Sequence, residues 1–364
     1  MLKSSLVVLA TTVALLAPPA AAAPSGSASS ETASDAARDS AVAVRTLKPS
    51  RLPRGPAARL PLLQGRTLRP SDGAKPIRVR VPAVKGQLRL LGQRSDGRWL
   101  VAAQTRSWQR VYAVRRDGSH RAVPRTRTVV ARSNRMGWLL ARGGERLVQT
   151  RWGAYTSGHT VRDATSGEVI ERYSTDVTAF PLDADGERLV VRLDAGVRDL
   201  VPGEPNTAVV KAGNAAFIAR DLVFAKTKGL QRGPTSIEEP TTPEWTARFA
   251  ALDVSPDGEL VLGTRTLVTH HRRPRVLELR RMSDGTLVRA FRYGGRVQPR
   301  DIHTQDEQTA RFESDSAFVL EVRRGGRSIL VRCTPEGSCE RASRWGRRIS
   351  VPFEKYVWWR RLNS

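Results

Sequence analysis

Short apolar runs separated by polar turns recur along most of the chain. Leu88–Leu91 leads through Arg94-Ser95-Asp96-Gly97 into Trp99–Ala102, and Phe249–Val254 leads through Ser255-Pro256-Asp257-Gly258 into Leu260–Leu262. The runs are rich in the β-branched and aromatic residues that favour strands. Asp closes a turn by hydrogen-bonding nearby backbone, and Gly accepts positive φ without a steric penalty. Each such segment therefore predicts an antiparallel hairpin.

A second hairpin follows the first within each repeat. Val276–Leu279 precedes Ser283-Asp284-Gly285 and then Leu287–Phe291, and Thr160–Arg162 precedes a turn ending at Gly167. Two hairpins in series predict a unit of four antiparallel strands.

The spacing of the first-turn glycines indicates the architecture. Gly97, Gly137, Gly186 and Gly258 are 40, 49 and 72 residues apart, and the long interval holds an irregular copy around 216–224. Four-stranded propeller blades repeat every 40–50 residues or so. An all-β propeller of four-stranded antiparallel blades is therefore predicted in preference to a sandwich or a solenoid, with Trp99 and Trp138 at equivalent core positions.

The ends of the repeat region suggest how the ring closes. Six copies are visible between about 86 and 345, the last a degenerate one near 312–322. Strand-like segments at 66–69 and 77–81 precede them, and another at 349–356 follows them. A closing blade shared between both ends removes the open edges of the ring. We therefore expect seven blades, with six as the alternative.

Two turns carry a resemblance to a known class. Ser255-Pro256-Asp257-Gly258 and the 163–168 turn resemble those of WD-repeat-like propellers, although the Trp-Asp and Gly-His pairs of true WD repeats are absent. Over about residues 60–360 the chain looks like secreted propeller proteins of high-GC bacteria. The resemblance implies a binding platform more often than an enzyme.

The N-terminus predicts export. Lys3, the apolar run Leu6–Leu16, a Pro pair and Ala20–Ala23 have the pattern of a cleavable signal peptide over residues 1–23. The run is too short to span a bilayer, and no later segment is long and apolar enough. Residues 24–60 are Ala/Ser-rich and then Pro/Arg-rich, which predicts a disordered linker. Residues 61–364 are expected to form one propeller domain of a secreted protein.

The formal net charge of +26 admits two interpretations. Removing the signal peptide takes away only Lys3, which leaves +25. Such an excess can attract polyanions, or it can reflect the Arg-rich coding of a high-GC genome. The second interpretation is preferred, because the basic residues are scattered through the repeats rather than gathered in one segment.

The two cysteines, Cys333 and Cys339, are separated by the turn-like sequence Thr-Pro-Glu-Gly-Ser. In an exported protein a disulfide can form, and a hairpin would bring the two side chains opposite each other. We predict a structural disulfide, since the spacing is neither that of a redox pair nor that of a metal site.

Few residues suggest chemistry. There is no nucleophile elbow, P-loop or dinucleotide fingerprint, so no catalytic residue, metal or cofactor is predicted. The longest break in the repeat, about 226–245, is a candidate binding loop, because binding residues collect on long loops of rigid scaffolds. A second candidate is the loop around 270–275. The candidate residues are Glu238, Glu239, Trp245, His270, His271, Arg272 and Arg273.

The favoured hypothesis is a secreted, non-catalytic, monomeric scaffold that binds a protein or an anionic cell-envelope polymer, without specific nucleic-acid recognition. Two alternatives stay open. An extracellular enzyme acting on glycans predicts carboxylates or histidines converging in the central funnel. An electrostatic polyanion binder predicts one continuous basic face and steep salt dependence.

Overall fold

The computed structural model describes residues 44–84, 88–129, 135–153, 155–193, 196–205, 207–229, 231–265, 275–293, 310–324, 327–346, 349–351 and 357–358. The chain divides into two compact units, Met1–Ala41 and Val42–Ser364. All described residues belong to the second unit, so the predicted signal peptide and residues 24–43 of the predicted linker lie outside them.

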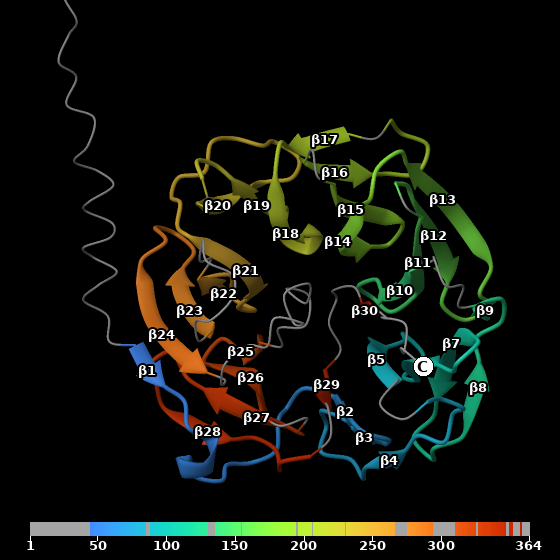
Figure 1. The fold of residues 1–364 in the computed structure, drawn as a ribbon, viewed down its shortest axis with the longest axis horizontal. Coiled ribbons are helices and arrows are strands. Elements are labelled where there is room, and N and C mark those ends of the chain that lie inside the picture. The colour runs from blue at the N-terminus through green and yellow to red at the C-terminus, as the bar shows by residue number, and fades with distance from the viewer. Residues whose placement is uncertain are drawn as a thin grey trace, which may run out of the picture. The chain divides into compact units, whose positions relative to one another are not determined.

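The second unit is a seven-bladed β-propeller, as predicted (Figure 1). We number the blades in the order of their innermost strands. Blade 1 contains β5 (Leu88–Gln93), β6 (Trp99–Gln104), β7 (Trp108–Val114) and β8 (His120–Ala122), and β9 (Thr128–Val129) also pairs with β7. Blade 2 contains β10 (Arg135–Leu140), β11 (Arg146–Trp152), β12 (Ser157–Asp163) and β13 (Val169–Thr175), with β30 (Val357–Trp358) beside β10.

The next four blades follow in chain order. Blade 3 contains β14 (Phe180–Asp185), β15 (Arg188–Leu193), β16 (Gly196–Leu200) and β17 (Thr207–Val210). Blade 4 contains β18 (Gly213–Phe217), the 3-10 turn η2 (Ile218–Arg220), β19 (Leu222–Lys226) and β20 (Arg232–Ser236). Blade 5 contains β21 (Phe249–Val254), β22 (Leu260–Arg265), β23 (Arg275–Arg281) and β24 (Leu287–Tyr293), and blade 6 contains β25 (Ala310–Ser314), β26 (Ala317–Arg324), β27 (Arg327–Cys333) and β28 (Cys339–Arg341).

Blade 7 closes the ring with strands from both ends of the propeller. Its innermost strand, β29 (Ile349–Ser350), pairs antiparallel with β2 (Leu62–Gln64), which continues to β3 (Thr67–Arg69) and β4 (Ile77–Arg78). The predicted shared blade is confirmed. Because β29 and β2 come from opposite ends of the domain, their pairing joins the first and last parts of the ring without a covalent link.

Two local predictions were wrong. Gly137 was expected in a turn, but it lies within β10, opposite Thr150 of β11. The turn after β10 instead contains Gly143 and Gly144, both at φ 77°. Trp138 therefore lies on a first strand whereas Trp99 lies on a second strand, so their positions are not equivalent, although both are buried in the core.

The segment 44–58, which the sequence placed in the linker, lies along the outer edges of blades 5 and 6. Its first strand, β1 (Val44–Thr46), pairs in parallel with β24, and Leu47 is buried in the core cluster that blades 5 and 6 share. The 3-10 turn η1 (Pro49–Arg51) follows, and the amide of Gly55 then donates to the carbonyl of Arg341 at 3.1 Å. This strap, residues 44–58, covers two strand edges that would otherwise stay unpaired.

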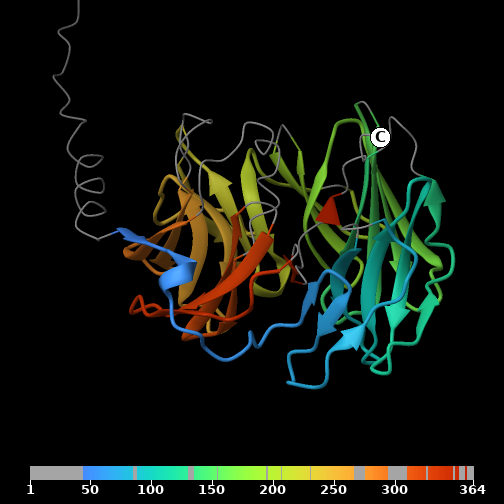
Figure 2. The ribbon, with the colours of Figure 1, turned by 60° about the horizontal axis from the view of Figure 1, so that its bottom comes forward.

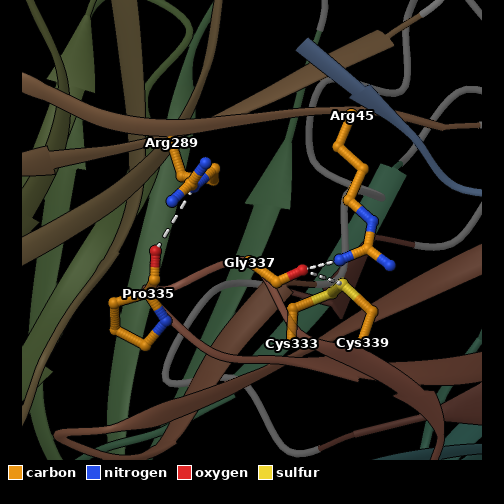
Figure 3. The surroundings of a disulfide bond; sticks show 6 residues. All are labelled: Arg45, Arg289, Cys333, Pro335, Gly337 and Cys339. Carbon is orange, nitrogen blue, oxygen red and sulfur yellow. Dashed lines mark hydrogen bonds between the residues drawn. A yellow bond between two sulfur atoms is a disulfide. The ribbon is translucent and has the colours of Figure 1, made fainter. Parts of the chain in front are cut away.

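The disulfide is confirmed. Cys333 and Cys339 face each other across the β27–β28 hairpin with their Cα atoms 4.2 Å apart. The same turn accepts a hydrogen bond from Arg45 of the strap at the carbonyl of Gly337, and one from Arg289 of blade 5 at the carbonyl of Pro335 (Figure 3). The turn therefore links the strap to blades 5 and 6.

Candidate functional site

Antiparallel pairing gives the propeller two faces with different connections. The turns between the first and second strands and between the third and fourth strands lie at one end of each blade, which we call the turn face. The connections between the second and third strands, and those between blades, lie at the other end, the loop face (Figure 2). Turns of neighbouring blades touch, since Arg94 donates to the carbonyl of Ala164 at 3.2 Å and the amide of Asp257 donates to Asp315 at 2.7 Å.

Every turn of the turn face carries at least one carboxylate. Turn chemistry explains the aspartates among them, because the Asp side chain accepts backbone N–H groups inside the turn. The amide of Ser119 donates to Asp117 and that of Thr286 donates to Asp284, both at 2.8 Å. The hydrogen bonds hold the pKa of both carboxyls below the usual range. The residues are Asp72, Asp96, Asp117, Glu145, Glu168, Glu187, Glu204, Asp221, Glu238, Asp257, Asp284, Asp315 and Glu336.

Many basic side chains near the turn face are paired with these acids. Arg116 lies 2.6 Å from Asp72, Arg125 lies 3.2 Å from Glu168, and Arg146 lies 3.7 Å from Glu187. Arg94 also pairs with Asp96, and its side-chain hydrogen bond is the main reason that the pKa of Asp96 falls to about 2. Several cations of the turn face are therefore neutralised by neighbouring acids.

The described connections of the loop face carry more bases than acids. Basic residues occur on the connections of most blades, whereas the acids are Asp176 and Glu244, the latter in the same blade 4–blade 5 connection as Arg248. Six of these basic side chains are exposed, and within the described residues they form no ion pair or side-chain hydrogen bond. We call them the basic set: Arg80, Arg106, Lys211, Lys228, Arg248 and Arg344. Their charge is available to a ligand.

Carboxylates on the innermost strands already have backbone partners. Asp183 of β14 accepts the amide of Ile218 at 2.7 Å, and Asp253 of β21 accepts the amide of Phe312 at 2.8 Å. Each bond joins one blade to the next. Asp183 and Asp253 therefore each take part in a contact between neighbouring blades.

The predicted loop residues are not gathered into one site. Trp245 is 8% exposed and packs in the core between blades 4 and 5, where its indole N–H donates to the carbonyl of Met282 at 2.6 Å. Glu238 pairs with Arg188 at 3.2 Å, and the amide of Glu239 donates to Ser236 at 2.8 Å. The expected loop 226–245 also contains β20. His270, His271, Arg272 and Arg273 lie outside the described residues.

The basic set could not be recognised from the order of charges along the chain, because that order does not show which face each residue occupies. In linear order acids and bases alternate, and no block stands out. Assigning the described charges to the odd or even connections of the four-strand repeat places the basic set on one face.

No helix among the described residues is long and apolar enough to cross a membrane. The described residues also contain no group of three or more His, Cys, Asp or Glu side chains arranged to hold a metal ion.

Comparison with known proteins gives the fold alone. No protein-family model and no curated protein sequence matches the chain. An uncharacterized protein of Listeria monocytogenes EGD-e superposes with a TM-score of 0.51 at 10% identity, covering 74% of this chain and 87% of its own. A functionally unknown protein of Desulfotomaculum acetoxidans DSM 771 gives 0.51 at 12% identity, covering 80% and 98%.

Proposed function

We propose that the chain is an exported, non-catalytic binding module whose loop face binds a polyanion of the cell envelope. The observation that carries this proposal is the partition of charge between the two faces of the propeller. The acids lie in the turns of one face with many of the nearby bases paired to them, and the unpaired bases of the basic set lie on the other face.

An unpaired cation on a surface attracts anions from a distance and gains further when ligand counterions are released. Arg80, Lys211 and Arg344 belong to connections on different parts of the ring, so the attraction extends over the loop face. Their exposure also means that no internal ion pair has to break before a ligand binds.

Export is supported by the disulfide between Cys333 and Cys339, which fits an oxidising compartment. The predicted signal peptide also indicates export. An envelope component therefore suits the proposal better than an intracellular nucleic acid does. The net positive charge also opposes self-association through the loop face, in agreement with a monomer.

The test compares two variants of the full chain that remove the same charge from opposite faces. The loop-face variant carries R106A, K211A, K228A and R248A. The matched control carries K75A, R115A, R121A and R281A, four exposed bases at or next to the turn face. Both are titrated with dextran sulfate between about 50 and 300 mM salt, a range in which several ionic contacts change affinity by orders of magnitude.

We expect the loop-face variant to bind at least about tenfold more weakly and with a shallower dependence of log K on log salt. Each lost contact to a flexible polyanion lowers that slope by about 0.7. The control should stay close to the wild type. Equal weakening of both variants would show that binding follows net charge alone and would overturn the assignment to the loop face.

A further inference from the structure

Among the described residues, three large apolar side chains are exposed on the loop face. Tyr155 is 82% exposed, Val129 72% and Val177 41%. All three lie at the loop-face ends of blades 1 and 2. Val169, 37% exposed, is the other exposed large apolar residue of the described chain. It begins β13, at the opposite end of blade 2.

Hydrogen bonds place the three residues around the loop-face end of blade 2. Val129 ends β9, and the neighbouring Thr128 accepts a hydrogen bond from Gln149 of β11 at 2.8 Å. Tyr155 lies in the connection from β11 to β12. Val177 lies just after β13, where its carbonyl accepts a hydrogen bond from Thr175 at 2.7 Å. Thr175 in turn pairs with Ser157, the residue that begins β12. We call Val129, Tyr155 and Val177 the apolar rim.

The backbone beneath the rim is firmly held. The indole N–H of Trp152 donates to the carbonyl of Ala179 at 2.7 Å, and the amide of Ala179 donates to the hydroxyl of Ser157 at 2.8 Å. The ring of Trp152 packs against Phe180 with centroids 5.7 Å apart. The rim therefore rests on the buried end of the blade 2–blade 3 interface, and its exposure does not come from a loose chain end.

Cations flank the rim. Arg106, Arg127 and Arg151 are exposed at the loop-face ends of blades 1 and 2, and the Arg127 guanidinium lies over the Trp108 ring, 5.9 Å from its centroid. A surface with exposed apolar tips between unpaired cations matches the boundary layer of an anionic bilayer. There acyl chains accept Val, the headgroup region accepts Tyr, and anionic headgroups attract Arg.

We propose that the loop face docks on an anionic lipid bilayer, with the apolar rim entering the interface. This inference rests on the proposed function and names its polyanion. Two observations favour a bilayer over a soluble polymer. The basic set is distributed around the ring, so a plane meets more of it at once than a linear chain does. Valine side chains also gain little from contact with a hydrated polymer, whereas they gain from hydrocarbon.

The test measures co-sedimentation of the full chain with vesicles of phosphatidylglycerol and phosphatidylcholine, and with vesicles of phosphatidylcholine alone. The rim variant carries V129S, Y155S and V177S. The matched control is V169S, which replaces an exposed valine at the far end of the same blade. All the replaced side chains are exposed, so thermal melting should confirm that both variants fold like the wild type.

The wild type should bind the anionic vesicles and leave pure phosphatidylcholine largely unbound. The rim variant should bind anionic vesicles at least about tenfold more weakly, while V169S stays within about twofold of the wild type. Dextran sulfate should bind the wild type and the rim variant equally. In a Y155W variant, indole fluorescence should shift to shorter wavelength on vesicle binding.

The outcomes separate the two proposals. If the rim variant binds vesicles as tightly as the wild type, or if the wild type binds dextran sulfate but no vesicle, the bilayer inference is overturned and the loop-face function stands. If the wild type binds neither ligand, both are overturned.

Discussion

The buried imidazole of His159 should make the propeller less stable in mild acid. His159 lies on β12 between Thr150 of β11 and Tyr173 of β13, and it is 1% exposed. Its Nδ1 is 2.9 Å from the hydroxyl of Thr150, and its Nε2 has no hydrogen-bond partner. A charged ring would need a hydrogen-bond acceptor at each nitrogen or contact with water. The buried site provides an acceptor at Nδ1 alone and excludes water. Burial therefore lowers the pKa of His159 to about 4 from its usual value of 6.5.

The size and sign of the effect follow from that pKa. Above about pH 6.5 the ring is neutral in both the folded and the unfolded chain, and it adds no pH dependence. Between pH 6.5 and 4 the imidazole of His159 is protonated in the unfolded chain but stays neutral in the folded chain. The free energy of unfolding therefore falls as the pH falls. Because the pKa of His159 is about 2.5 lower in the folded chain than in the unfolded chain, the free energy of unfolding should be lower by roughly 3 kcal/mol at pH 4 and below.

The turn-face acids act in a lower pH range. The pKa of Asp96 is about 2 in the folded chain, against a usual value of 3.8. A lowered carboxyl pKa gives stability above the unfolded pKa, and this is lost as the pH falls through the folded one. The two effects are therefore separable, since His159 acts between about pH 6.5 and 4 and Asp96 acts below about pH 4.

The assay is denaturant unfolding at pH 7 and at pH 4.5 for the wild type, H159N and H120N. Asn can keep a hydrogen bond to Thr150 and cannot gain a proton in this range. We expect the wild type and H120N, which alters an exposed residue of β8, to lose about 2–3 kcal/mol more than H159N does between the two pH values. If all three lose the same stability, or if the ring titrates near pH 6.5 by NMR, the reasoning is refuted.

Further predictions concern the buried ion cluster, the disulfide, the closing blade and the strap. Glu278 is fully buried between Arg265 and Arg280, so E278Q should cost about 3–5 kcal/mol in denaturant unfolding by leaving buried guanidinium charge uncompensated; a cost below about 1 kcal/mol would contradict this. Replacing both cysteines with serine should cost about 2 kcal/mol because the closed loop is short, and reductant should then have no further effect. I349A, at a residue 2% exposed in β29, should cost about 3 kcal/mol and speed unfolding. L47A should release the strap, which limited trypsin digestion followed by mass spectrometry would detect as faster cleavage after Arg45 and Arg51.

The architecture could be predicted because its determinants are local. Each turn needs Asp or Ser to cap the backbone and Gly to accept positive φ, and these residues recur at blade spacing. The wrong assignment of Gly137 to a turn has the same origin. It precedes Trp138 as a turn glycine would, yet it lies in extended β10, because Gly143 and Gly144 supply the positive φ of the actual turn.

The parts that could not be predicted depend on distant segments. Pro234 suggests a loop, but it lies in β20 opposite Phe224, where a proline is tolerated on the side without a ladder hydrogen bond. The strap is rich in Pro and Arg, and it is ordered because the edges of β24 and β28 offer unpaired backbone. Similarly, Trp245 could not be assigned to the core until its contact with Phe224 was known.

The two faces acquire their charges for different reasons, and this difference supports a functional interpretation of the basic set. Asp117 and Asp284 are required on the turn face by the turns that they cap, so the fold explains the acids there. Folding gives no comparable role to Arg106 or Lys228, which make no side-chain pair within the described chain. A genomic bias toward Arg would place bases on both faces alike, with turn acids neutralising those nearby. That bias accounts for the total charge, but it does not by itself distribute exposed, unpaired bases over connections of several blades on one face. Selection for an anionic ligand would produce that arrangement of the basic set.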